Sequence, residues 1–110
     1  MSVELNFERI KQEKFSDNNS RVLRAINTLR TRYVRIKDLE YGLEPDMNKS
    51  EIIDSVNYLN EGGYIKLRET GSRREIEDLA DGEPERLEAK LTAKGIAFLN
   101  GRIDDPCIRR

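Results

Sequence analysis

The chain has 110 residues, enough for one domain with a modest core. Its 20 basic and 21 acidic side chains give a net charge of −1, which excludes a uniformly basic nucleic-acid-binding coat. The absence of histidine and the single cysteine, Cys107, exclude Ser-His-Asp and Cys-His catalysis, an internal disulfide and a multi-cysteine zinc site. Neither a membrane-spanning apolar run nor an apolar signal-peptide segment is visible. We therefore expect an intracellular, cytoplasmic protein that is not an enzyme and needs no cofactor or metal.

The first helix is predicted after a polar segment. Residues 1–18 show no single period, because their apolar side chains fit both strand alternation and a helical turn. The polar stretch at residues 16–20 indicates a break and the start of a helix. Residues 20–31 then repeat apolar side chains at helical spacing, which predicts a helix there. The apolar residues of this stripe are Val22, Ala25, Ile26 and Leu29.

A short second helix is predicted next. Residues 33–35 are β-prone, and the apolar residues Ile36, Leu39 and Leu43 that follow them have helical spacing. Gly42 and the nearby proline end this helix.

The third helix has the clearest boundaries. Asn48 and Glu51 have the spacing of a capping box at a helix N-terminus. The pair Gly62-Gly63 is a typical C-terminal stop. A helix over residues 49–61 follows from these two signals. Its apolar stripe, which we expect to be buried, consists of Ile52, Ile53, Val56 and Leu59.

A β-hairpin is predicted after the two glycines. Residues 64–69 alternate and indicate a strand, and residues 86–91 alternate again as a return strand. Between them lies a long, exposed, polar loop, in which Ser72 and Glu75 have the spacing to cap a short helical turn.

The last helix is expected to begin at Thr92 and to stop at Gly101. The domain organisation is then an N-terminal extension at residues 1–18, one domain at residues 19–101 and an irregular tail at residues 102–110.

The order of these elements, and two sequence segments, resemble a known family. Residues 48–65, NKSEIIDSVNYLNEGGYI, resemble the third helix and first wing strand of MarR- and PadR-like winged helix-turn-helix proteins. Residues 91–95, LTAKG, resemble the step by which such domains leave the wing and begin a final helix. The end of the chain is similar to small winged-helix proteins of bacterial prophages, whose function is mostly unassigned. The resemblance covers residues 20–101 and implies a mainly α fold with a small β-hairpin, of the α+β class.

This resemblance implies a DNA-binding transcription regulator of prokaryotic or prophage origin. In the family, the third helix lies in the major groove of double-stranded DNA, and the wing contacts the minor groove or the backbone. If the family's arrangement is applied to this sequence, the resemblance implies that the residues facing the groove are Lys49, Ser50, Asp54, Asn57 and Tyr58. The wing contacts are assigned to Lys66, Arg68, Arg73 and Arg74, and further phosphate contacts to Arg21, Arg35 and Lys37. Of these, Asn57 is suited to read an adenine through two hydrogen bonds.

A homodimer is also expected, without a membrane contact. The terminal segments at residues 3–15 and 92–101 carry more apolar side chains than one small core needs. The apolar residues of these segments include Leu5, Phe7, Ile10, Phe15, Ile96, Phe98 and Leu99. Phe7, Ile10 and Phe15 either contact a second copy or pack on their own domain.

The distribution of charge supports an alternative function. Residues 19–43 carry six bases and two acids, whereas residues 44–62, which include the third helix, carry one base and five acids. Non-specific DNA affinity comes mostly from neutralising phosphates, so an acidic third helix is a poor docking surface. The alternative is a protein–protein interaction module that uses the same fold without binding DNA.

Overall fold

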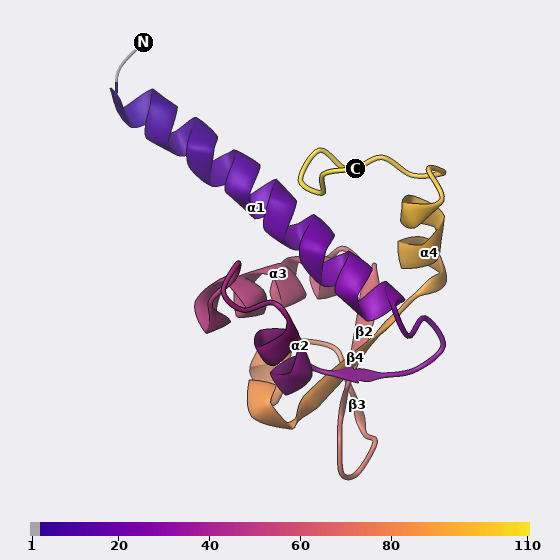
Figure 1. Ribbon diagram of the computed structural model, residues 1–110. Coiled ribbons are helices and arrows are strands. Elements are labelled where there is room, and N and C mark those ends of the chain that lie inside the picture. The colour runs from indigo at the N-terminus through magenta and orange to yellow at the C-terminus, as the bar shows by residue number, and fades with distance from the viewer. Residues whose placement is uncertain (1–2) are drawn as a thin grey trace.

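The computed structural model describes residues 3–110 of the chain, and side chains from residue 6 onward. The side chain of Leu5, expected at a dimer contact, lies outside the described residues. The described chain forms four α-helices and one four-stranded antiparallel sheet (Figure 1), which confirms the expected α+β class. The helices are α1 (Val3–Asn27), α2 (Ile36–Gly42), α3 (Lys49–Glu61) and α4 (Ala93–Leu99). The strands are β1 (Val34–Arg35), β2 (Ile65–Glu69), β3 (Glu75–Ile76) and β4 (Leu87–Leu91), and two 3₁₀ turns, η1 (Leu79–Asp81) and η2 (Pro84–Arg86), precede β4.

Helix α1 is one continuous helix of 25 residues, so the predicted break at residues 16–20 is wrong. Its polar residues in this region are buried: Asn18 is 4% exposed and Asn19 is fully buried. The Asn18 side chain donates a hydrogen bond to Glu51 on α3, and Asn19 donates one to the carbonyl of Cys107 in the C-terminal tail. These partners lie far away in the sequence, which is why a local reading treats the segment as a solvent-exposed break.

The C-terminal end of α1 also differs from the prediction. The helix ends at Asn27, and residues 28–32 form turns. Leu29 therefore leaves the predicted stripe and is 51% exposed, whereas Leu23 joins Val22 and Ile26 in the core.

The predictions for α2 and α3 are confirmed. In the capping box of α3, the Asn48 side chain accepts from the Glu51 amide at 2.9 Å, and Glu51 accepts from the Asn48 amide at 3.0 Å. Ile52, Val56 and Leu59 are fully buried. Ile53, the fourth residue of the predicted stripe, is only half-buried and lies at the border of the core.

The strand order is β1-β4-β2-β3, so the return strand β4 lies between β1 and β2. The helical turn predicted from Ser72 and Glu75 is wrong. Glu75 begins β3, which pairs with β2, and the Ser72 hydroxyl donates to Glu69 within the hairpin turn. A capping pattern in a hairpin turn is satisfied by the neighbouring strand instead of by a helix.

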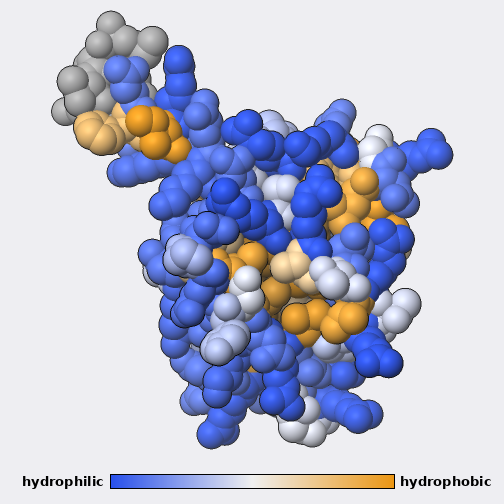
Figure 2. All heavy atoms as spheres, viewed as in Figure 1, coloured by the Kyte–Doolittle hydropathy of each residue, from blue (hydrophilic) through white to orange (hydrophobic). Residues whose placement is uncertain are grey.

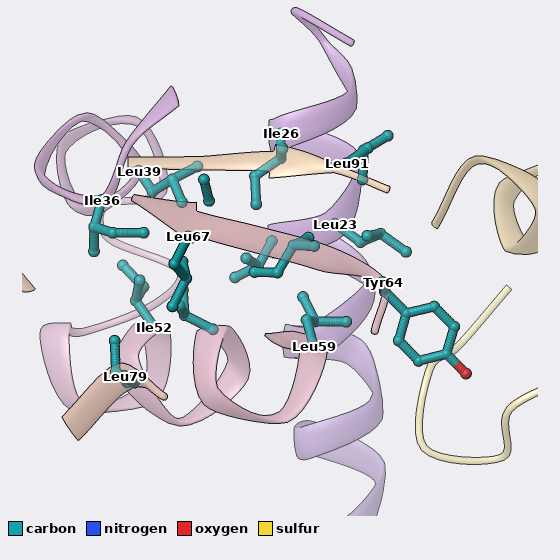
Figure 3. Close-up of a cluster of buried hydrophobic side chains, with 14 of the residues drawn as sticks. Leu23, Ile26, Ile36, Leu39, Ile52, Leu59, Tyr64, Leu67, Leu79 and Leu91 are labelled. Carbon is teal, nitrogen blue, oxygen red and sulfur yellow. The ribbon is translucent and has the colours of Figure 1, made fainter. Parts of the chain in front are cut away.

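The hydrophobic core lies between the helices and one face of the sheet (Figure 3). Alternate residues of β2 and β4 point into it, in the register that pairs Ile65 with Leu91 and Leu67 with Ala89. The residues between them, including Lys66 and Lys90, therefore lie on the outer face of the sheet. Burying each large aliphatic side chain contributes about 1.5–3 kcal/mol to stability.

The two segments that carry the family resemblance contact one another. Lys94 donates to the carbonyl of Gly62 at 2.7 Å, and the Thr92 hydroxyl donates to the carbonyl of Gly63, which has a φ of 80°. A Cβ at Gly95 would lie 2.2 Å from the carbonyl oxygen of Tyr64, so only glycine allows α4 to approach β2 this closely. These glycines and polar side chains therefore position α4 against the end of α3.

The N-terminal half of α1 extends beyond the rest of the domain (Figure 1). Phe7 and Ile10 lie there and are each 59% exposed, and Figure 2 shows hydrophobic surface at this projecting end. Within the described chain, no helix combines the length and the apolar character that crossing a membrane requires.

Candidate nucleic-acid interface

One side of α3 carries polar residues that have no hydrogen-bond partner among the described side chains, and we call it the open side. It consists of Ser50, Asp54 and Asn57, which are spaced three or four residues apart and therefore lie along one helix face. Ser50 and Asp54 are exposed and Asn57 is half-buried. Together with Glu51, Ile53 and Leu79 of η1, these residues line a shallow groove beside α3. The structure thus brings together three of the five residues assigned to the major groove.

Lys49 lies at the start of α3 and is held by an acid. Its ammonium group is 2.5 Å from Oε1 of Glu85, which belongs to η2. The hydrogen bond and the charge of Glu85 raise the pKa of Lys49, and the same contact lowers the pKa of Glu85. The single base of α3 is therefore already paired, although a fully exposed ion pair of this kind exchanges partners at little cost.

Tyr58 lies on another side of α3, which we call the closed side and define by Glu51, Ser55 and Tyr58. The ring of Tyr58 contacts Phe15 of α1 edge to face, with 5.3 Å between the ring centroids. Ser55 is fully buried, and Glu51 forms an ion pair of 2.8 Å with Lys14 of α1. The structure therefore separates Tyr58 from the open side and gives it internal partners.

The C-terminal tail completes the closed side. The Tyr58 hydroxyl lies 2.8 Å from Oδ2 of Asp105 and the Tyr64 hydroxyl 2.7 Å from the same atom, while the Cys107 amide donates to Oδ1 at 2.9 Å. In Figure 3, Tyr64 lies at the edge of the core cluster, and its hydroxyl points away from the other labelled side chains. The tail has no regular helix or strand, as predicted, yet Ile108 is only 3% exposed. It is therefore a packed part of the domain.

The pKa values of Tyr58, Tyr64 and Asp105 reflect the hydrogen bonds between these residues. Burial and the hydrogen bond to Asp105 raise the pKa of Tyr64 to about 12, and the same two causes raise the pKa of Tyr58 further. Burial alone would raise the pKa of Asp105, but hydrogen bonds from Tyr64, the Cys107 amide and Tyr58 outweigh it and lower that pKa. Asp105 is therefore a charged anchor of the tail that the sequence analysis missed. The sequence contained one signal that the tail is packed on the domain. This signal was Ile108, because an apolar residue is unusual in a solvated tail.

The hairpin residues assigned to DNA have different surroundings. Arg73 is exposed in the turn between β2 and β3, with a φ of 62°, whereas Arg74 is paired with Glu69 at 2.9 Å. Arg68 lies 3.6 Å from the centre of the Tyr33 ring and 2.5 Å from Glu88. Arg68 is therefore half-buried and holds the sheet together, while Arg73 projects at the turn.

The remaining assigned bases are spread over several elements. Arg21 is exposed on α1 and donates to the Asn18 side chain at 3.1 Å. Arg35 and Lys37 are exposed at the start of α2, and Lys66 is exposed on the outer face of the sheet, directly opposite Lys90. The structure does not gather these bases around the open side of α3.

Comparisons with family models, with curated proteins and with solved structures gave no match to this chain. Among the described residues, no group of three or more acidic or cysteine side chains is placed to hold a metal ion.

Proposed function

We propose that this protein is a winged helix-turn-helix protein that binds double-stranded DNA and regulates transcription. The observation that supports it best is the open side of α3, whose polar residues Ser50 and Asn57 have no internal hydrogen-bond partner among the described side chains. The projecting hairpin turn with Arg73 follows the same helix along the chain. A polar helix face without internal partners, followed along the chain by a projecting turn with an exposed base, suits the readout of a groove.

In this proposal, α3 enters the major groove and the hairpin between β2 and β4 serves as the wing. Asn57 hydrogen-bonds the edge of an adenine, and Ser50 contacts a neighbouring base or phosphate. Arg73 contacts the flanking backbone. The exposed Phe7 and Ile10 on the projecting part of α1 pair with a second copy, and the dimer sets the spacing of two half-sites.

A second candidate is supported by the charge around α3. Asp54 lies on the open side itself, Glu85 pairs with Lys49, and Glu77, Asp78 and Asp81 are exposed on the segment that surrounds Leu79. This acidic surrounding repels phosphates and suits a basic protein surface. The alternative function is therefore a protein-binding module in which the same groove beside α3 holds a partner.

The decisive experiment compares Asn57→Ala with the control Asn100→Ala, because Asn100 is exposed beyond the end of α4. A preferred duplex is first selected from a random-sequence pool with the parent protein. Asn57→Ala should lose about 1–3 kcal/mol of discrimination at one base step and keep the parent's salt dependence. Asn100→Ala should bind like the parent. If the parent selects no sequence, or if both variants bind alike, the regulator proposal is wrong.

A further inference from the structure

The outer face of the sheet carries a groove with three bases, which we call the basic sheet groove. It is lined by Arg30 from the loop after α1, Lys66 of β2 and Lys90 of β4, with Ile96 of α4 at its side. The groove has no acidic residue among its lining residues. This surface is distinct from the open side of α3, because β2 and β4 turn their buried residues toward the helices and these lysines away from them.

The two lysines face one another at a cost in stability. Lys66 and Lys90 are direct cross-strand partners in the antiparallel register. Like charges in this position destabilise a sheet, whereas an acid at either position would stabilise it. The neighbouring pair on the same face, Arg68 with Glu88, shows the stabilising arrangement. The Lys66–Lys90 pair is therefore not explained by the stability of the sheet.

The bases of the groove have no acidic partner among the described side chains. Among the described side chains, seven ion pairs hold bases such as Arg68 and Arg74 within 4.0 Å of a carboxylate. None of these pairs includes a base of the groove, and Arg30 donates only to the neutral side chain of Asn27. Three unneutralised positive charges in one concavity attract a ligand that carries several closely spaced negative charges.

We propose that the basic sheet groove binds the phosphate backbone of duplex DNA, as a surface separate from α3. Duplex DNA carries one charge per about 1.7 Å of its axis, and each base that neutralises a phosphate releases a counterion. This property favours DNA over an acidic peptide as the ligand. The proposal deepens the proposed function, and rests on it, by naming a second surface for the same ligand. It assigns phosphate contacts to a groove whose lining residues include no acid, away from the acidic residues around α3.

The test measures binding of a labelled random-sequence duplex of about 20 base pairs at several salt concentrations. The groove variant is R30Q/K66Q/K90Q. The control is R24Q/R102Q/R109Q, which removes the same charge from exposed positions on α1, after α4 and in the C-terminal tail. The groove variant should bind at least about tenfold more weakly at about 50 mM salt, and its salt slope should fall by about two to three. The control should change affinity by no more than about twofold, since its bases contact no phosphate.

Three results would overturn the proposal. The first is that the parent does not bind the duplex at about 50 mM salt. The second is that both triple variants lose affinity equally. The third is that the groove variant changes only the oligomeric state, as measured by sedimentation. The last result would assign the groove to a contact between copies of the chain. The groove variant should melt at or above the parent temperature, because it removes the Lys66–Lys90 repulsion. The single variant K66Q should show about one third of the change in slope.

The test also separates this proposal from the proposed function. Random-sequence duplex reports only on phosphate contacts, whereas Asn57→Ala reports on sequence preference. If Asn57→Ala has no effect and the groove variant still lowers the salt slope, base reading by α3 is wrong and the basic sheet groove remains. If Asn57→Ala relaxes the preference and the groove variant matches its control, the groove proposal alone fails.

Discussion

The closed and open sides of α3 carry similar kinds of polar residues but use them in opposite ways. On the closed side, Glu51 and Tyr58 are held by α1 and the C-terminal tail. On the open side, Ser50, Asp54 and Asn57 have no hydrogen-bond partner among the described side chains. Buried polar groups usually find partners inside the protein, and Glu51 and Tyr58 do so, whereas the buried Ser55 hydroxyl has none among the described residues. The paired groups of the closed side therefore contribute to stability.

The largest effect on stability is expected at the anchor of the closed side. Asp105→Asn removes the charge that accepts hydrogen bonds from Tyr58 and Tyr64, and it should lower the free energy of unfolding by about 1–3 kcal/mol. The control is Asp104→Asn, because the Asp104 side chain is 95% exposed and pairs only with Arg110. That variant should change stability by about 0.5 kcal/mol or less, as measured by urea denaturation. Equal effects of the two variants would show that the tail is not held by Asp105.

The pH dependence of unfolding tests the same contacts of Asp105. The pKa of Asp105 is lowered in the folded state, so its stabilising effect is present above its ordinary pKa of 3.8 and is lost as the pH falls below it. The pKa of Tyr64 is raised to about 12, so its effect is present below the ordinary value of 10.0 and is lost as the pH rises toward 12.

Two measurements check these signs. The stability difference between the parent and Asp105→Asn should shrink below about pH 4. When the pH is raised from about 10 to 12, the free energy of unfolding should fall less for Tyr64→Phe than for the parent, because the variant has no hydroxyl to ionise at this position. A parent whose stability is constant over that alkaline range would contradict the buried hydrogen bond from Tyr64 to Asp105.

The smallest effect on stability is expected on the open side. Ser50→Ala and Asn57→Ala remove side chains without internal partners and should each change the free energy of unfolding by about 0.5 kcal/mol or less. Thermal unfolding measures this directly. A loss of more than about 1 kcal/mol would show that the open side is part of the fold and is not kept for a ligand.

The sequence predicted those elements whose signals are local. The capping box of Asn48 and Glu51 and the two glycines after α3 fixed both ends of that helix, because each signal acts within one helical turn. The alternation in β2 and β4 predicted the paired strands in the same way. The predicted contact residues Ser50 and Asn57 lie together on the open side, as the helical spacing required.

Two departures of the structure from the local sequence pattern have a common cause. The polar residues 16–20 resemble a break, but the side-chain amides of Asn18 and Asn19 donate to partners more than 30 residues away in the sequence. Tyr58 was assigned to the DNA-facing side, and only the folded tail shows that Asp105 holds it. In each case a long-range hydrogen bond, which no local pattern contains, changed the role of a polar residue.

By itself, then, the sequence determined the order and ends of most elements, because helix caps, glycine stops and apolar periods act over a few residues. The tertiary structure alone decided which polar groups are internal and which remain available. It placed the tail over Tyr58, and it set Lys66 opposite Lys90 through the register of β2 and β4. The physical reason is that burial and charge depend on what lies nearby in space, and residues distant in the sequence supply those neighbours.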